Sequence, residues 1–179
     1  MIKIIKILES GGVAAIPTDT VYGLMGDPTS PDAVEKVCEI KNRRRDRELS
    51  ILVRSIEDMK DICKTTPTVE YFIKNKLENN TIILEKKDER RFGLISRKTI
   101  GMRIPNDAFL LELLRLRGAP LFATSVNISG QREYLLYEDI VRDFGDRIDI
   151  IVKNNIKSTN KPSDIFKAEG EKIIKIRGN

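Results

Sequence analysis

Histidine and tryptophan are absent from this chain of 179 residues, and cysteine occurs only as Cys38 and Cys63. The absence of histidine excludes Ser-His-Asp and Cys-His catalysis, zinc sites built on imidazole, and imidazole pH switches. Two cysteines are too few for a disulfide framework or a cysteine-rich metal site. We therefore expect two reduced thiols in a cytoplasmic protein.

The sequence also lacks long apolar runs and the common nucleotide-binding motifs. No run approaches the roughly 18 apolar residues of a membrane span. Residues 1–8 are apolar, but Lys3 and Lys6 interrupt them, and no signal-peptide cleavage site follows. Neither G-x-x-x-x-G-K-S/T nor G-x-G-x-x-G occurs, which argues against the common ATPases and against dinucleotide enzymes. We expect no contact with a membrane.

The composition is that of an ordinary folded domain. Hydrophobic residues make up 40% of the chain and charged residues 33%, which is too apolar for a disordered protein. The length fits one domain over residues 1–179. With 32 basic and 27 acidic residues the net charge is +5, which hints at an anionic partner.

Strand and helix patterns alternate along the chain. Apolar runs predict strands, and spacings of three to four residues together with capping residues predict helices. Helices are expected at 1–8, from Pro31 onward, and at 55–63, 67–77, 107–117 and 137–144. Strands are expected at 13–17, 49–53, 81–84, 99–104, 121–125, 148–152, 165–167 and 173–176, with a charged loop at 86–97. This interleaving predicts a single α/β domain with a mixed sheet.

Four segments carry small polar or basic residues at the ends of these elements, where α/β folds place ligands. They are residues 18–23, 41–47, 99–103 and 123–130. Each has an ordinary structural explanation: a capped turn, a solvated helix end, an edge strand whose arginine pairs with a carboxylate, and a strand-to-loop turn. The occurrence of all four in one chain favours a binding site.

Two of these segments make geometric predictions. In the strand at 99–104, the alternation places Ile100 and Met102 toward a core and Thr99 and Arg103 on the other side, and Gly101 between them leaves space for a ligand. Ser125 and Asn127 share a face if the strand at 121–125 continues.

The segment at 41–47 is the most basic of the four. Five of its seven residues are Lys or Arg. Such a run suits either a phosphate site or a helix end favoured by the helix dipole. Lys41 continues the apolar face of the preceding helix, so its ammonium must snorkel or find an anion.

Taken together, these motifs resemble the YrdC/YciO family in order and spacing over nearly the whole chain. The matching runs are Pro17-Thr18-Asp19-Thr20-Val21-Tyr22-Gly23-Leu24, Lys41-x-Arg43, Gly101-x-Arg103-x-Pro105 and Thr124-Ser125-Val126-Asn127-x-Ser129-Gly130. The resemblance implies a twisted mixed parallel and antiparallel sheet, flanked by helices around a basic concavity. It also implies a threonylcarbamoyl-AMP synthase, a nucleotidyltransferase that joins L-threonine, bicarbonate and ATP with release of pyrophosphate.

The resemblance further implies roles for individual residues. Lys41 and Arg43 would be catalytic. Threonine would be held by Thr18, Arg103, Ser125 and Ser163. ATP would be held by Lys41, Arg43, Arg45, Thr99, Asn127 and Arg177. No protein metal site is implied; Mg²⁺ would arrive with the nucleotide phosphates, and no tightly bound cofactor is expected.

This chemistry is compatible with the absence of histidine. A carbamate formed from threonine and CO₂ already carries an anionic oxygen, so no base with a pKa near 7 is needed for attack on ATP. Such a product feeds the machinery that transfers threonylcarbamoyl groups to tRNA. The alternative is a YciO-like paralogue that binds a nucleotide or double-stranded RNA without synthase activity. We expect RNA binding by a synthase to be weak.

Overall fold

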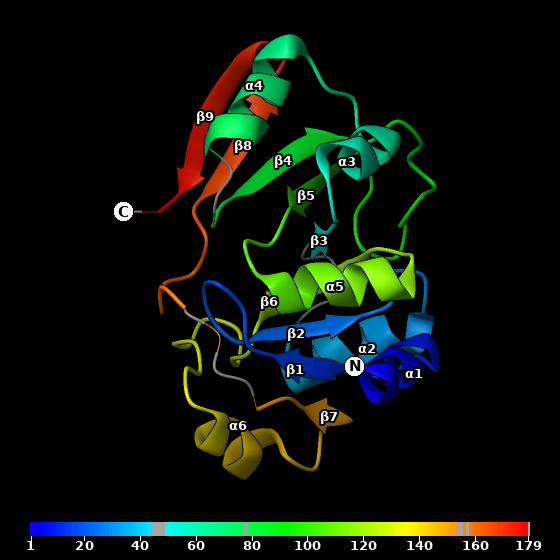
Figure 1. Ribbon diagram of the computed structural model, residues 1–179, viewed down its shortest axis with the longest axis vertical. Coiled ribbons are helices and arrows are strands. Elements are labelled where there is room, and N and C mark those ends of the chain that lie inside the picture. The colour runs from blue at the N-terminus through cyan, green and yellow to red at the C-terminus, as the bar shows by residue number, and fades with distance from the viewer. Residues whose placement is uncertain (44–48, 77–78, 154–155, 157, 179) are drawn as a thin grey trace.

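The strands of the described residues form one twisted sheet, which is the centre of the fold (Figure 1). The computed structural model describes residues 1–43, 49–76, 79–153, 156 and 158–178. Within these residues, the strands lie in the order β7-β1-β2-β6-β3-β5-β4-β8-β9. Their bounds are β1 Ala14–Ile16, β2 Gly23–Gly26, β3 Ser50–Leu52, β4 Thr81–Glu85, β5 Thr99–Arg103, β6 Leu121–Ser125, β7 Ile150–Ile151, β8 Ile165–Glu169 and β9 Lys172–Arg177. The pairs β1/β7, β3/β5 and β4/β8 are parallel and the others antiparallel, so the sheet is mixed as predicted.

Helices lie between these strands or before them, and capping residues mark the ends of some. They are α1 Ile2–Glu9, α2 Pro31–Ile40, α3 Ile56–Ile62, α4 Pro67–Lys76, α5 Ala108–Arg117 and α6 Tyr137–Phe144. The Ser30 hydroxyl accepts a hydrogen bond from the Ala33 N–H at the start of α2, and Asp107 accepts one from Leu110 at the start of α5. Gly118 ends α5 in the left-handed conformation, with φ of 72°.

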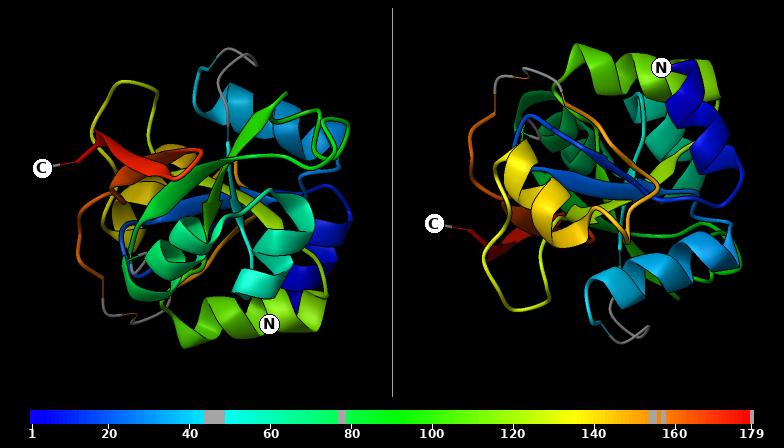
Figure 2. Two further views of the ribbon diagram at one scale, coloured as in Figure 1. Left: turned by 90° about the horizontal axis from the view of Figure 1, so that it is seen from above. Right: turned by 90° about the horizontal axis from the view of Figure 1, so that it is seen from below.

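The helices cover the two faces of the sheet unequally. Figure 2 shows α1 and α5 together on one side and α2 on the other. The larger core lies on the α2 face and includes Val37 of α2, Met59 of α3, Ile73 of α4 and Ile140 of α6. The smaller core lies beneath α1 and α5, against β1, β2, β3 and β6. On this second face, the sheet beyond α5 is open to a cavity.

The predicted elements agree closely with the structure, and one strand was missed. The helix predicted at 137–144 has those bounds, and the other predicted helices differ only at their ends or, for 67–77, end on a residue that is not described. The missed strand is β2. It was not predicted because it begins at Gly23 and ends at Gly26, and glycine in a sequence usually indicates a turn. Among the described residues, no helix is long and apolar enough to cross a membrane.

Candidate active site in a basic cavity

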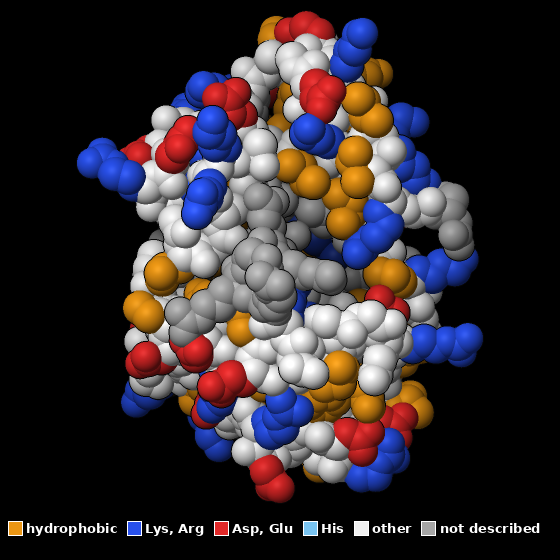
Figure 3. Space-filling model, turned by 180° about the vertical axis from the view of Figure 1, so that it is seen from behind, with side chains coloured by type: hydrophobic (Ala, Val, Ile, Leu, Met, Phe, Trp, Pro, Cys, Tyr) orange, Lys and Arg blue, Asp and Glu red, His pale blue; other side chains and the backbone are white. Residues whose placement is uncertain are grey.

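The floor of the cavity is one face of the sheet. Side chains alternate between the faces of a strand, and paired residues on neighbouring strands share a face. Ala123 pairs with Met25 and Ser50, and Ser50 pairs in turn with Gly101. Two residues further along these strands, and therefore on the same face, Leu52 pairs with Arg103. The cavity, of about 230 Å³, therefore draws its floor from strands that are distant in sequence. The molecule is hollowed there, and basic side chains are visible within the hollow (Figure 3).

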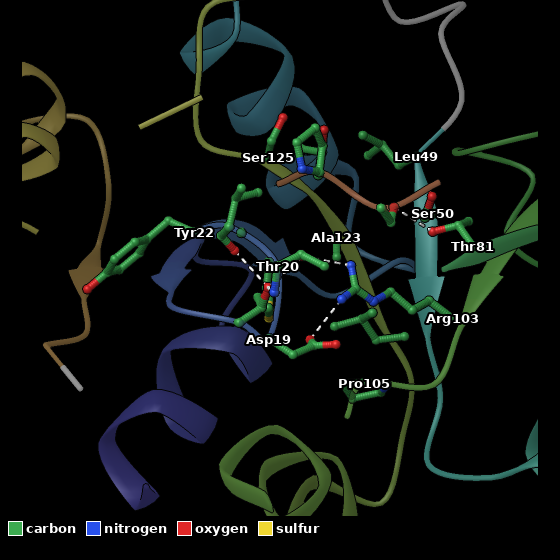
Figure 4. Close-up of a pocket in the computed structure, with 18 of the residues that line it drawn as sticks. Asp19, Thr20, Tyr22, Leu49, Ser50, Thr81, Arg103, Pro105, Ala123 and Ser125 are labelled. Atoms are coloured by element: carbon green, nitrogen blue, oxygen red, sulfur yellow. Dashed lines mark hydrogen bonds and ion pairs between the residues drawn. The ribbon is translucent and has the colours of Figure 1, made fainter. Parts of the chain in front are cut away.

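Arg103 extends from β5 across this floor to the loop between β1 and β2 (Figure 4). Its Nη1 donates a hydrogen bond to the Thr20 hydroxyl at 2.9 Å, and its Nη2 lies 2.8 Å from Oδ1 of Asp19. Ile100 and Met102 are completely buried on the opposite face, as the alternation predicted. Arg103 is therefore a cavity residue, and its carboxylate partner lies in the same cavity.

The loop that receives Arg103 is organised by a chain of hydroxyl groups. The Thr18 hydroxyl donates to the main-chain oxygen of Val21 at 2.7 Å, so its single proton is used. The Thr20 hydroxyl must then be the donor in the 2.9 Å contact between the two threonine side chains. The Thr20 N–H also donates to Thr18 Oγ1, at 3.0 Å. Thr18 lines the cavity, but its hydroxyl is fully engaged within the loop, and its contact with threonine stays a prediction.

A second cluster of polar side chains lies at β4, on the other side of the cavity. Thr81 Oγ1 and Ser163 Oγ are 3.0 Å apart, and Arg177 Nη2 donates to the Ser163 main-chain oxygen at 3.2 Å. A Cβ atom on Gly101 would lie 2.9 Å from Ser50 Oγ and 3.3 Å from Thr81 Cγ2. Ser50 and Thr81 therefore occupy the space that the sequence assigned to a ligand above this glycine.

Lys41 lies behind the cavity wall. It is the C-cap residue of α2 and is 3% exposed. Its ammonium donates to the main-chain oxygens of Ser125 and Asn127 and to Asn127 Oδ1, at 2.6, 3.2 and 2.6 Å. Burial, reinforced by the charge of Arg43, lowers the pKa of Lys41 to about 8. The sequence predicted that Lys41 must snorkel or find an anion. Its ammonium does not snorkel, because it is buried against neutral carbonyl and amide oxygens, and its contact with an anion stays a prediction.

Asn127 points toward Lys41 because β6 ends at Ser125. Its side-chain oxygen accepts from both Lys41 and the Ser125 hydroxyl, the latter at 2.8 Å, and its Nδ2 donates to the Gln131 main-chain oxygen. The condition on which Ser125 and Asn127 would share a strand face is not met, since the strand ends at Ser125. Ser125 lines the cavity, and Asn127 supports it from behind.

The structure sorts the predicted site residues into three groups. Those that line the cavity are Thr18, Arg43, Arg103, Ser125, Ser163 and Arg177. Lys41, Thr99 and Asn127 are not in its lining, and their contacts with ATP stay predictions. Arg45 lies outside the described residues. Four further polar residues line the cavity: Asp19 and Thr20 belong to the predicted segment 18–23 but had no individual roles, and Ser50 and Thr81 were not predicted. Strand alternation across the sheet could have found Ser50 and Thr81.

The described lining is basic. It includes Arg43, Arg103 and Arg177 against the single carboxylate of Asp19. Within the described part of the chain, no cluster of three Asp, Glu or Cys side chains could hold a metal ion. Arginine forks and hydroxyl groups suit anionic ligands such as carboxylates and phosphates.

The two thiols take no part in this site. Cys38 and Cys63 are free and buried. Burial raises the pKa of both thiols, that of Cys63 to about 12. The prediction of two unbridged thiols is confirmed, and neither thiol is activated as a nucleophile.

The fold and the cavity define an α/β protein with a mixed sheet and a basic, hydroxyl-lined cavity on one sheet face. The Sua5/YciO/YrdC family model, described as telomere recombination, matches residues 6–178. The chain belongs to this family.

Known relatives agree in sequence and in structure. The threonylcarbamoyl-AMP synthase of Vibrio campbellii is 25% identical over 187 residues, which cover 97% of this chain and 96% of that protein. The structure of P. abyssi Sua5 complexed with L-threonine superposes with a TM-score of 0.86 at 25% identity, covering 98% of this chain and 52% of that one. The structure of E. coli YciO superposes with a TM-score of 0.84 at 25% identity, covering 98% and 86%. This chain thus spans about half the length of that Sua5 chain.

Proposed function

We propose that this protein is a threonylcarbamoyl-AMP synthase, which condenses L-threonine, bicarbonate and ATP to threonylcarbamoyl-AMP and pyrophosphate. The observation that carries the proposal is the reach of Arg103 from β5 to the loop at 18–22, within one cavity that Arg43 and Arg177 also line. Two anionic substrates that react with each other need several fixed cations within one cavity. The name of the Vibrio relative and the threonine in the Sua5 structure support the same reaction.

The reaction uses positioning and charge rather than a strong base. The threonine nitrogen and CO₂ from bicarbonate form a carbamate. One carbamate oxygen attacks the α-phosphorus of ATP, and the bond to the bridging oxygen of the β-phosphate breaks, which releases pyrophosphate. Holding the two anions together lowers the entropic part of the barrier, and fixed cations stabilise the charge on the departing phosphates. No step requires a histidine.

The cavity residues divide between the two substrates. Arg103 and Ser125 would bind the threonine carboxylate, because a guanidinium fork matches two carboxylate oxygens. Arg43 and Arg177 would bind the triphosphate, with Ser163 and Thr81 supplying hydroxyl groups beside Arg177. Lys41 would act near the phosphates or through the Ser125–Asn127 segment that it holds. Mg²⁺ would come with the nucleotide, since this ion is usually held by phosphates and only one or two carboxylates.

The product is a mixed anhydride suited to passing its acyl group to a nucleophile. We place the protein upstream of the enzymes that transfer threonylcarbamoyl groups to tRNA. Direct RNA binding would be weak, because the cavity is scaled to small molecules and phosphate contacts alone give modest affinity.

The deciding experiment is a reconstitution. The protein is incubated with ATP, labelled threonine and bicarbonate, and pyrophosphate and labelled threonylcarbamoyl-AMP are measured. Both should appear, and both should vanish when threonine or bicarbonate is omitted. Arg103→Ala should abolish both products. The control is Arg115→Ala, which changes an exposed arginine of α5 that pairs with Glu112 and should leave both products at wild-type levels. Nucleotide or double-stranded RNA binding without product would instead support a YciO-like paralogue.

A further inference from the structure

Asp19 is the junction of three segments at the Arg103 end of the cavity. Its carboxylate is buried, with the residue 4% exposed. Oδ1 lies 2.8 Å from Arg103 Nη2, and Oδ2 accepts a hydrogen bond from the Asn106 N–H at 3.3 Å. Its main-chain oxygen accepts another from the Thr159 N–H at 2.9 Å. Asp19 therefore fixes the β1–β2 loop against β5 and against the segment that precedes β8.

The contact with Arg103 is close but not aligned as a hydrogen bond. Among the described residues, Asp19 Oδ1 and Arg103 Nε and Nη2 have no hydrogen-bond partner, although all three atoms are buried. Buried polar atoms are nearly always satisfied, and exceptions occur where a ligand or a rearrangement completes the site. Arg103 as a residue is 8% exposed, and Asp19 and Thr20 hold the two terminal nitrogens of its guanidinium. Its position and its charge balance both depend on Asp19.

This pairing has a consequence for ligand choice. An isolated buried guanidinium attracts any anion, and phosphate more strongly than carboxylate because phosphate carries more charge. The Asp19 charge lies beside the same guanidinium and repels the additional charge of phosphate. A like charge placed against the wrong ligand is a common source of specificity. The triphosphate is thereby directed to Arg43 and Arg177.

We propose that Asp19 is a positioning residue that holds Arg103 for a single carboxylate and excludes phosphate from that end of the cavity. This inference rests on the proposed function, because it presumes that threonine binds at Arg103. Asp19 acts through Arg103.

The test is Asp19→Asn, which keeps the shape of the side chain and removes its charge. Threonine and ATP binding are measured separately by calorimetry. Threonine affinity should fall by about tenfold or more, as expected for loss of a charge-assisted contact, and ATP affinity should change by less than about twofold. Inorganic phosphate, added as a competitor, should displace threonine from Asp19→Asn and leave the wild type unaffected. A purely structural role for Asp19 would not create this phosphate competition.

Asp27→Asn is the matched control. It removes the carboxylate of another ion pair, in which the partly buried Asp27 contacts the buried side chain of Arg117, and neither residue lines the cavity. It should leave threonine affinity and phosphate competition at wild-type values. Equal effects of the two substitutions, or unchanged threonine affinity in Asp19→Asn, would overturn the inference.

The remaining outcomes separate this inference from the proposed function. A wild-type protein that binds threonine but forms no threonylcarbamoyl-AMP removes the proposed function, and the binding comparison still decides the role of Asp19. A wild type that binds no threonine overturns both. If Asp19→Asn does not fold, the wild type decides: phosphate that displaces threonine from it contradicts the exclusion, and phosphate that leaves threonine bound supports it.

Discussion

The ammonium group of Lys41 lies 2.6 Å from the side-chain oxygen of Asn127, although the two residues are 86 positions apart in the chain. Two further acceptors, the main-chain oxygens of Ser125 and Asn127, complete the three hydrogen bonds that an ammonium can donate. The Ser129 N–H donates in return to the Lys41 main-chain oxygen at 2.9 Å. The end of α2 and the segment after β6 are thus joined at one lysine.

Lys41→Ala should lower both stability and activity while leaving the fold intact. It leaves buried carbonyl and amide oxygens unpaired, which costs about 1–3 kcal/mol of unfolding free energy. Displacement of Ser125, together with loss of the charge, should reduce kcat/KM by about ten- to a hundredfold. Denaturant unfolding and pyrophosphate release measure the two effects. Lys60→Ala, which removes an exposed ion pair with Glu70, should cost less than about 1 kcal/mol and retain activity. Wild-type activity and ATP affinity in Lys41→Ala would exclude a role for Lys41.

The lowered pKa of Lys41 predicts opposite pH trends for activity and stability. Its pKa is about 8 in the folded protein, against 10.5 ordinarily. Between these values the unfolded chain binds a proton that the folded protein does not, so the Lys41 contribution to unfolding free energy rises with pH. Below pH 8 both states are protonated, and this dependence disappears. Activity should instead fall above about pH 8, as the ammonium loses its charge.

The comparison of wild type with Lys41→Met isolates this titration. Between about pH 8 and 10.5, the unfolding free energy of the wild type should rise relative to that of the variant. Only the wild-type kcat/KM should show an ionisation near pH 8. The same ionisation in Lys41→Met would assign it to another group.

Arg103→Lys should weaken threonine binding more than ATP binding. Lysine keeps the charge, but its single nitrogen cannot contact both Asp19 and Thr20 and also offer a fork to a carboxylate. We expect KM for threonine to rise by about tenfold, with KM for ATP nearly unchanged. Steady-state kinetics with each substrate varied in turn provide the measurement. An equal rise in both constants would contradict a threonine-specific role.

Gly101→Val should damage the cavity and leave β5 in place. Valine is a favourable strand residue, but its Cβ would lie 2.9 Å from Ser50 Oγ and 3.3 Å from Thr81 Cγ2. The hydroxyl groups of the floor must shift, and the added methyl groups fill the space above them. Ligand affinity should fall by about tenfold or more, since contacts of this kind depend on placement within about 0.5 Å. Calorimetry with ATP and with threonine tests the prediction, and wild-type affinities for both would refute it.

RNA binding should be weak and steeply dependent on salt. Contacts between arginine or lysine and phosphate release counterions, so such affinity falls sharply as salt rises. Filter binding with tRNA and with double-stranded RNA at several salt concentrations measures this. Tight binding that persists in high salt, in a protein that forms no threonylcarbamoyl-AMP, would favour the RNA-binding alternative.

Local signals predicted most of the fold. The predicted starts at Pro31 and near 107 and the predicted end at 117 agree with the structure, where Ser30, Asp107 and Gly118 cap the helices, because caps are satisfied by neighbours in sequence. The alternation at 99–103 placed Arg103 on the cavity side for the same reason. β2 was missed because its pairing with β1 and β6 outweighs the glycines at its ends, and that pairing is not a local property.

The candidate site was predicted less completely, because its contacts are long-range. Thr18, Arg43, Arg103, Ser125, Ser163 and Arg177 do meet in one cavity, as the resemblance implied. The three acceptors of Lys41 come from residues more than 80 positions away, so sequence spacing could not reveal them. The partnership of Asp19 with Arg103 crosses a similar distance and requires the pairing of β2 with β6, of β6 with β3 and of β3 with β5.

The cavity floor can be completed only late in synthesis and folding, because its strands come from both halves of the chain. Its residues run from Gly23 in β2 to Arg177 in β9, with β3, β4, β5, β6 and β8 between them. A ribosome-bound chain can pack α1 against early strands, but it has no complete site until the β8–β9 hairpin emerges. Contacts of such large sequence separation also slow folding, because the chain must close long loops before these contacts form. Activity should therefore appear late in refolding, after most helical structure has returned.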